Sequence, residues 1–208
     1  EENFARAEGS LPPARPAAGP RVLVHSGLLY PSERDPRAFY DAIAGLKAAG
    51  RIGTDTLRVV LRASGFEAYH RRCIEALGIQ DIVFLAPVIP YEAALQEMLA
   101  ADGLLLFQAA NCNEQIPAKI YEYLRAGRPI FAMTDRAGDT ARLLLDTGID
   151  TLAQLDDRQG IAASLMDFLE RLETGRAPVA AAAEARRHSR RARTRELAAL
   201  LDGVVPRL

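Results

Sequence analysis

The sequence predicts an α/β fold, a doubly wound parallel sheet of about six strands. Two observations lead to it. Short apolar runs alternate with helical segments along the 208 residues, with a period of roughly 20 to 30 residues. Each run is apolar throughout instead of alternating with polar residues, which is typical of parallel strands covered by helices on both faces. Helical right-handed crossovers between such strands predict the order 3-2-1-4-5-6.

Turn and capping residues bound the individual elements. The expected strands are residues 21–26, 57–62, 82–86, 103–108 and 129–133, with a weak one at 151–155. Asp35 as N-cap, Pro36 at the first helical position and Gly50 after the end delimit the first crossover helix. The same reasoning predicts helices at 67–77, 91–101, 117–126, 140–147 and 157–173, and a last one from 177 to 202 that ends at Gly203.

The chain divides into three parts. Residues 1–20 are poor in large apolar side chains, and we expect them to form an interdomain linker. Their tract LPPARPAAGP should be extended and unable to build a core. Residues 21–175 form the predicted domain, and residues 176–208 a C-terminal helix. Because the chain starts at Glu1 and not at Met, we expect a processed or excised fragment.

Composition excludes several classes of protein. With 49% hydrophobic and 25% charged residues, the chain matches one globular domain and not a disordered or membrane-spanning protein. A net charge of −1 provides no general attraction to nucleic acid. Cys73 and Cys112 lack disulfide or metal-ligand spacing, which favours free thiols in a reducing cytosol. The histidines are too widely spaced to suggest a metal site, and His25 at a strand end is expected to be packed.

Candidate binding residues lie where the predicted sheet reverses its strand order. The ligand crevice of a doubly wound sheet lies beyond the carboxyl ends of the first and fourth strands, which selects the loops at 27–35 and 109–116. The second loop carries Glu114, and Glu122 follows on the next helix, opposite its expected core stripe. A solvated helix face is the alternative for Glu122. Glu67 and Glu75 have the same spacing but lie away from this crevice.

The chemistry of these loops suits a nucleoside diphosphate sugar. A helix N-terminus at Pro117 offers free N–H groups to a diphosphate, and Lys119 adds a positive charge. Carboxylates accept hydrogen bonds from vicinal sugar hydroxyls. Gly27 permits close approach, and Arg34 is a candidate phosphate ligand, as is Arg37 unless it points outward. Neither a Gly-x-Gly-x-x-Gly motif nor a Walker P-loop is present, which weakens both of those alternatives.

The passage NEQIPAKIYEYLRAGRPIFAM resembles the C-terminal donor domain of retaining glycosyltransferases with the two-domain, Rossmann-like GT-B fold (glycosyl transferases group 1, family four). The family's paired-glutamate motif is followed by a turn of a small residue, Gly, any residue and Pro, and Ala126 to Pro129 match it. HSGLLYPSERDPRAFYDAI resembles the family's phosphate loop and its helix, and VFLAPVIPYEAALQEMLAADGLLL its third strand through its fourth. Ala86 departs from the family's usual Gly.

The resemblance implies specific roles. Glu122 would bind the ribose hydroxyls, Glu114 would contact the donor sugar as the catalytic residue, and Val88 would lie at the nucleobase. The pyrophosphate would be held beside Gly27 by Arg34, by Lys119 and by the N–H groups that the backbone segment of Gln115, Ile116, Pro117 and Ala118 offers.

By the same resemblance the chain is the donor domain of a retaining, metal-independent hexosyltransferase. It needs no cofactor, its donor is a UDP- or GDP-linked sugar, and its acceptor is a glycan, a lipid-linked glycan or a small molecule, as in polysaccharide biosynthesis. The acceptor domain would precede Glu1, so we expect donor binding by this chain without turnover. Two alternatives remain: a non-catalytic nucleotide-binding module or partner subunit, and a sugar-nucleotide epimerase of related fold.

A basic cluster lies near the C-terminus. Residues 186–195 hold six arginines, of which Arg186 is the first and Arg195 the last. A solvated helix face is one interpretation, since apolar residues follow at helical spacing. The other is attraction to an anionic membrane, which would place a cytoplasmic protein peripherally at its inner face. Binding to nucleic acid is not expected, because no aromatic residues interleave with the arginines.

Overall fold

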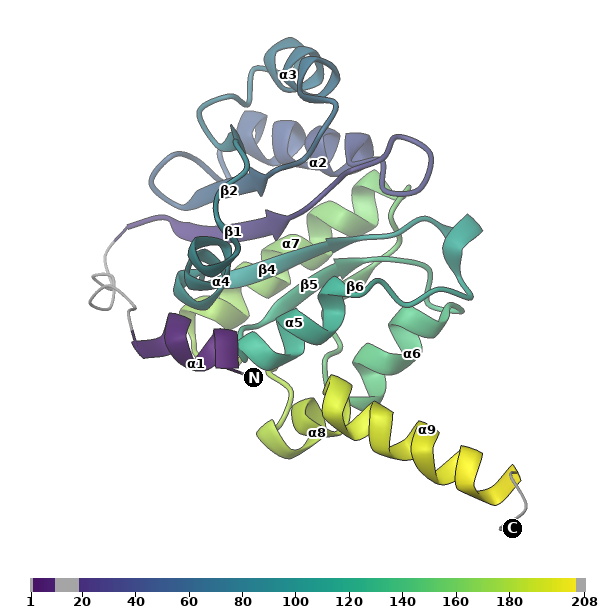
Figure 1. Cartoon of the computed structure of the whole chain (residues 1–208). Helices are drawn as coiled ribbons and strands as arrows, with labels where there is room; N and C mark the ends of the chain where they lie inside the picture. The colour runs from purple at the N-terminus through teal and green to yellow at the C-terminus, as the bar shows by residue number, and fades with distance from the viewer. Residues whose placement is uncertain (1, 10–18, 205–208) are drawn as a thin grey trace.

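The computed structural model describes residues 2–9 and 19–204 (Figure 1). Its centre is a six-stranded sheet in the order β3-β2-β1-β4-β5-β6, with every pair of neighbours parallel. The strands are β1 Arg21–Ser26, β2 Leu57–Arg62, β3 Val83–Ala86, β4 Gly103–Phe107, β5 Ile130–Met133 and β6 Leu152–Ala153. Both the predicted fold class and the predicted strand order are confirmed.

A glycine in the middle of the sheet lets a helix pack closely on it. β1 pairs with β4 through Leu23 and Gly103. A Cβ atom at Gly103 would come within 2.9 Å of the Phe168 ring and 3.0 Å of the Leu23 side chain, so a larger residue would separate the helix from the sheet. All five residues of β4 are buried, as expected for a central parallel strand.

Helices cover both faces of the sheet (Figure 1). Phe39 of α2, Ile74 of α3 and Phe168 of α7 pack into one core, whereas Leu95 of α4 and Tyr123 of α5 pack into the core on the opposite face. The helices are α1 Glu2–Gly9, α2 Arg37–Ala48, α3 Glu67–Ala76, α4 Tyr91–Ala100, α5 Lys119–Ala126, α6 Asp139–Asp146, α7 Arg158–Glu173, α8 Ala182–Arg187 and α9 Arg190–Val204, with a short 3₁₀ turn at Ala110–Cys112.

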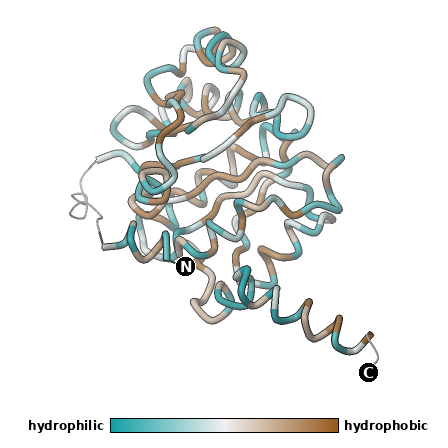
Figure 2. Tube along the Cα trace, viewed as in Figure 1, coloured by the Kyte–Doolittle hydropathy of each residue, from teal (hydrophilic) through white to brown (hydrophobic). Residues whose placement is uncertain are grey.

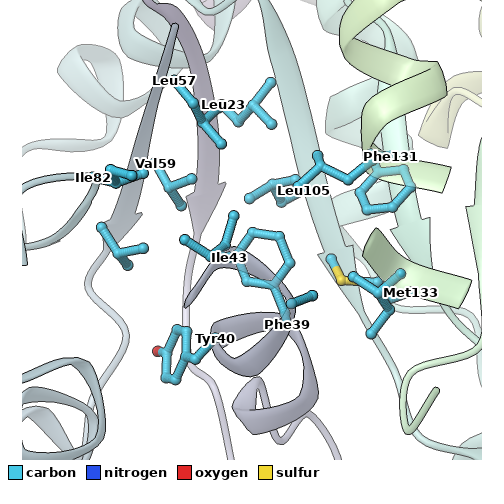
Figure 3. Packing of buried hydrophobic residues seen from close by; sticks show 14 of the residues in the cluster. Leu23, Phe39, Tyr40, Ile43, Leu57, Val59, Ile82, Leu105, Phe131 and Met133 are labelled. Carbon is cyan, nitrogen blue, oxygen red and sulfur yellow. The ribbon is translucent and has the colours of Figure 1, made fainter. Parts of the chain in front are cut away.

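Aromatic rings join helices to strands in the larger core. Figure 2 shows the hydrophobic residues concentrated along the strands, and Figure 3 shows Phe39 and Ile43 of α2 directed at Leu105 and its neighbours. Phe39 meets Phe107 edge to face at 5.5 Å, and Phe131 stacks on Phe168 at the same centroid distance. Truncating a buried ring of this kind typically costs about 3–5 kcal/mol, so these contacts contribute substantially to the sheet-helix packing.

Several element ends differ from the expected ones. α5 begins at Lys119, two residues after the predicted start at Pro117. α2 has Pro36 as its N-cap instead of Asp35, whose carboxylate accepts the N–H of Arg37 at 3.1 Å. Gly50 follows α2 with φ +64°, the left-handed conformation that the predicted helix end requires.

The N-terminal segment is not wholly extended. Residues 2–9 form α1, which buries Phe4 and Ala7 against α4 in the second core. Arg125 lies over the Phe4 ring at 5.0 Å and also pairs with Glu8 at 2.8 Å. α1 therefore belongs to the second core of the domain, although it lies in the predicted linker. Residues 10–18, the greater part of the expected Pro- and Ala-rich tract, lie outside the described residues.

The C-terminal segment forms two helices instead of the expected one. α8 ends at Arg187, and the Ser189 hydroxyl accepts the N–H of Ala192 at 3.2 Å in the first turn of α9. Gly203 lies inside α9, not at its end. α9 projects from the domain and buries none of its residues (Figure 1). Among the described residues, no helix is long and apolar enough to cross a membrane.

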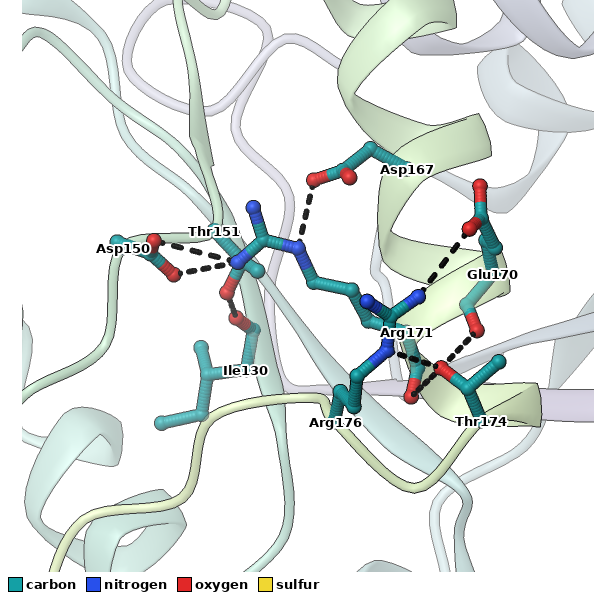
Figure 4. A network of polar contacts seen from close by, with 8 residues as sticks. All are labelled: Ile130, Asp150, Thr151, Asp167, Glu170, Arg171, Thr174 and Arg176. Carbon is teal, nitrogen blue, oxygen red and sulfur yellow. Dashed lines mark hydrogen bonds and ion pairs between the residues drawn. The ribbon is translucent and has the colours of Figure 1, made fainter.

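A polar network links the end of α7 to the segment just before β6 (Figure 4). Arg171 bonds Asp150 at 2.9 Å and Asp167 at 2.8 Å. Arg176 donates to the Thr174 hydroxyl at 2.9 Å. Exposed pairs of this kind contribute about 0–1 kcal/mol each, so the buried rings dominate the stability of this region.

Candidate functional site

The candidate site lies at the carboxyl ends of β1 and β4, where the strand order reverses. The two loops that were predicted to meet there are bonded to each other. The Ala109 N–H donates to the Glu33 carbonyl at 2.7 Å, and the Asn111 side chain donates to the Ser32 carbonyl at 3.2 Å. The loop after β1 and the loop after β4 thus form one continuous rim.

His25, next to the end of β1, is fully buried beneath this rim. Its Nδ1 lies 2.9 Å from the Leu105 carbonyl, to which it donates, so its Nε2 is free to accept from Lys119 Nζ at 3.0 Å. Burial, and then the charge of Lys119, hold the pKa of His25 well below its ordinary value of 6.5. His25 is accordingly neutral at physiological pH, and it is packed as expected.

Lys119, the first residue of α5, brings an unusual positive charge to the site. Burial and the nearby Arg34 lower the pKa of its amine from 10.5 to about 7, while Glu122 acts in the opposite direction. Neither Arg34 nor Lys119 forms an ion pair with any residue that the structure describes. Gly27, at φ +114°, makes room for the amine, because a Cβ there would approach Nζ to 3.1 Å. The site therefore holds two neighbouring cationic groups without a carboxylate bound to either.

Backbone donors at the start of α5 face the same region. The N-cap residue, Ala118, supplies no side-chain cap. Within the described residues, the N–H groups of Ile116, Ala118 and Lys119 donate to no protein acceptor. The N–H of Gln115 is already used, since it donates to the Cys112 carbonyl at 3.0 Å, and Pro117 has none. An uncapped helix N-terminus beside two cations is an arrangement that suits an anion chemically.

Gln108 shapes the loop that carries these donors. It follows β4, is almost fully buried, and donates from Nε2 to the carbonyls of Cys112 at 2.6 Å and Gln115 at 2.7 Å. The Thr140 hydroxyl donates to the same Gln115 carbonyl at 3.1 Å. Sequence reasoning placed Gln108 in the strand and assigned it no role. A glutamine directly after an all-apolar strand was the available signal.

Glu122 lies on the half-buried side of α5, next to the first residue of α4. The Tyr91 hydroxyl donates to its Oε1 at 2.8 Å. Burial, followed by this carboxylate, raises the pKa of Tyr91 to about 12. The side chain of Val88, three residues before Tyr91, is 80% exposed. Sequence reasoning missed Tyr91, because its partner is 31 residues away.

The remaining candidates are more loosely held. Glu114 is exposed on the loop before α5, and its carboxylate has no hydrogen-bond partner among the residues described. Arg37 points outward, with 66% of its side chain exposed, and pairs with Asp35 at 2.6 Å. Glu67 and Glu75 are exposed on α3. No group of three metal-ligating side chains is found among the described residues.

Several solved glycosyltransferase structures have the same architecture as this chain. The apo form of the lipopolysaccharide outer core galactosyltransferase WaaB superposes with a TM-score of 0.66 over 94% of this chain and 52% of its own, at 15% identity. The C-terminal domain of the group 1 glycosyltransferase LpcC from Francisella tularensis matches over 85% of this chain and 86% of its own, at 15% identity and a TM-score of 0.56.

This chain has the fold of a GT-B glycosyltransferase C-terminal domain. A third match, the pneumococcal O-GlcNAc transferase GtfA in complex with UDP and GlcNAc, has a TM-score of 0.62 at 14% identity and covers 90% of this chain but 36% of its own. The chain thus spans about half or less of the two-domain proteins it resembles. No protein-family model matches the sequence, and no curated protein matches it significantly. The GT-B fold is therefore established by structure alone.

Proposed function

We propose that this chain binds a nucleoside diphosphate sugar, UDP- or GDP-linked, as the donor-binding half of a retaining, metal-independent glycosyltransferase. The observation that supports this most directly is the pair of cationic groups, Arg34 and Lys119, beside the uncapped start of α5. Such a site suits the diphosphate, which carries the negative charge that develops as the sugar leaves. GtfA, which shares the GT-B fold, was solved with UDP.

The other residues fit around a diphosphate held at that point. The Glu122 carboxylate, which the hydrogen bond from Tyr91 orients, accepts hydrogen bonds from the ribose hydroxyls. The nucleobase lies against the exposed side chain of Val88. Glu114, with an exposed and unbonded carboxylate, contacts the donor sugar. Fixed donors aimed at the departing diphosphate stabilise its charge without reorganisation, which is the main catalytic contribution open to this half of the protein.

The second half of the enzyme would carry the acceptor. The full-length glycosyltransferases of the same fold are about twice as long as this chain or longer. We therefore propose an acceptor domain in the same polypeptide, and donor binding without transfer by the 208 residues alone.

Thermal unfolding with UDP, GDP and ADP and their sugars tests the proposal. We expect at least one nucleotide to raise the melting temperature, and Glu122→Ala to remove the shift. Glu75→Ala is the matched control, because Glu75 is an exposed helical glutamate on α3, remote from the site. No shift with any nucleotide would refute donor binding. A shift that survives Glu122→Ala would refute the ribose assignment. Interconversion of the bound sugars would favour an epimerase, and binding without transfer by the two-domain protein would favour a non-catalytic module.

We also propose that α9 contacts an anionic membrane. Its exposed aliphatic residues share one helix face, and basic residues of the 186–195 segment lie at its start. The exposed aliphatic residues are Leu197, Leu200, Leu201 and Val204. An aliphatic face next to a dense positive charge matches a bilayer with acidic headgroups.

Co-sedimentation with vesicles checks the membrane proposal. We expect binding to phosphatidylglycerol vesicles, weaker binding at high salt, and none to phosphatidylcholine. The double change Leu197→Ser and Leu201→Ser should abolish it, whereas Leu145→Ser, on exposed Leu145 of α6, should not. Equal binding by the double variant would show that α9 does not insert.

A further inference from the structure

Arg62, the last residue of β2, makes a set of contacts that the site described above does not use. Its Nε and Nη2 bond the two carboxylate oxygens of Glu97 on α4 at 2.9 and 2.6 Å. Its Nη1 donates to the Pro87 carbonyl at 2.7 Å. The Arg62 and Glu97 side chains are only 14% and 23% exposed. Arg62 thus forms a largely buried, bidentate ion pair with Glu97 and also bonds one backbone carbonyl of the connection between β3 and α4.

That connection has little else to hold it. Pro87 and Pro90 have no N–H, so they cannot donate backbone hydrogen bonds. Among the described residues, the bond from Arg62 is the one hydrogen bond made to the backbone of residues 87–89. The N–H and C=O of Val88 form no hydrogen bond with any residue that the structure describes. Val88 directly follows the carbonyl that Arg62 holds.

A buried ion pair is a costly way to secure a loop. Removing two charges from water costs several kcal/mol per ion before their attraction is counted, and apolar side chains of similar volume often stabilise a fold as well or better. Such a pair does fix the directions of the hydrogen bonds that Arg62 donates, because the guanidinium is planar and its donors point at fixed angles. Arg62 therefore fixes the orientation of the peptide that precedes Val88 more closely than packing alone would.

We infer that Arg62 and Glu97 are positioning residues that orient the Val88 backbone and so determine which nucleobase the site accepts. The inference rests on the proposed function. A fixed N–H donor reads the edge of a base by hydrogen-bond complementarity. Uracil presents an acceptor at O4 beside its N3–H donor, whereas cytosine presents an amino donor at that position, so one orientation of the peptide favours one base.

The test compares UDP, CDP and inorganic pyrophosphate by titration calorimetry. We expect Arg62→Met to lower the ratio of UDP to CDP affinity about tenfold, in line with the usual discrimination by a bidentate contact. Glu97→Gln should lower it less, since the amide still accepts from Arg62. Pyrophosphate affinity should change less than twofold, because it does not reach Val88. Arg58→Met is the matched control: Arg58 lies on the same strand, over the Phe84 ring at 4.2 Å.

Backbone relaxation measured by NMR provides a second readout that does not depend on nucleotide. The order parameter of the Val88 N–H should fall in Arg62→Met and not in Arg58→Met. Nucleotide binding with an unchanged UDP to CDP ratio, or an equal loss of UDP and pyrophosphate affinity, would overturn this inference alone. Absence of nucleotide binding by the unmodified protein would refute the proposed function together with it.

Discussion

Lys119 allows a quantitative test, because its charge state should couple folding to pH. Its pKa is about 7 in the folded protein and 10.5 ordinarily, owing first to burial and then to Arg34. Between these two values the unfolded chain binds more protons than the folded one, so stability rises with pH. Lys119→Met removes the titrating amine. The variant should therefore lose this rise, whereas Lys47→Met should keep it.

The expected size follows from the two pKa values. Integrating the proton difference from pH 7 to pH 9 gives a rise of about 2 kcal/mol in the free energy of unfolding. Below pH 7 burial of Lys119 destabilises the folded protein by its full amount, and above pH 10.5 this destabilisation disappears. Urea denaturation at several pH values measures it. Lys47 and Lys119 are the only lysines in the sequence, so Lys47→Met tests whether loss of the other lysine has the same effect on the pH profile.

Nucleotide binding should show the opposite trend. A diphosphate favours protonated Lys119, so the affinity for UDP should fall as pH rises above 7, by up to about tenfold per pH unit. Calorimetry in two buffers with different ionisation enthalpies would detect the accompanying proton uptake. In Lys119→Met the affinity should be low and nearly independent of pH. A wild-type stability profile parallel to that of Lys119→Met would refute the coupling, and UDP affinity that does not change above pH 7 would refute protonation of Lys119 on binding.

Three further predictions concern other parts of the domain. Phe4→Ala should lower the free energy of unfolding by about 3 kcal/mol in urea titrations, because the ring is 5% exposed against α4; a change below about 1 kcal/mol would show that α1 is dispensable. Ala63→Gly should raise the melting temperature, since Ala63 has φ 53° and the left-handed conformation costs a residue with Cβ about 1 kcal/mol; an unchanged or lower value would contradict the strain. Tyr91→Phe should weaken UDP binding several-fold, in line with about 1 kcal/mol for one hydrogen bond to Glu122, with no effect on pyrophosphate. Equal weakening of both ligands would show that Tyr91 acts on the diphosphate.

The sequence alone determined the class and the topology. All-apolar strands, crossover helices and glycines such as Gly50 and Gly127 are local signals, each set by backbone sterics or by the need to bury both faces of a strand. Both glycines close their helices in the left-handed conformation. Element ends were less well predicted, as for α5, because the first turn of a helix depends on where its loop is held. Here Gln108 holds that loop from the strand below.

Only the tertiary structure decided the pKa values in the site and the long-range hydrogen bonds that hold its residues in place. His25 and Lys119 are 94 residues apart, and the lowered pKa of Lys119 results from their shared burial beside Arg34. The bonds from Arg62 to Pro87 and from Tyr91 to Glu122 likewise join residues 25 and 31 positions apart. α1 looked like linker because a single Phe in a polar segment has no periodic signal, and its burial depends on the surface that α4 offers. Local propensity and hydrophobic pattern specify elements and their order, whereas desolvation and charge pairing depend on which residues folding brings together.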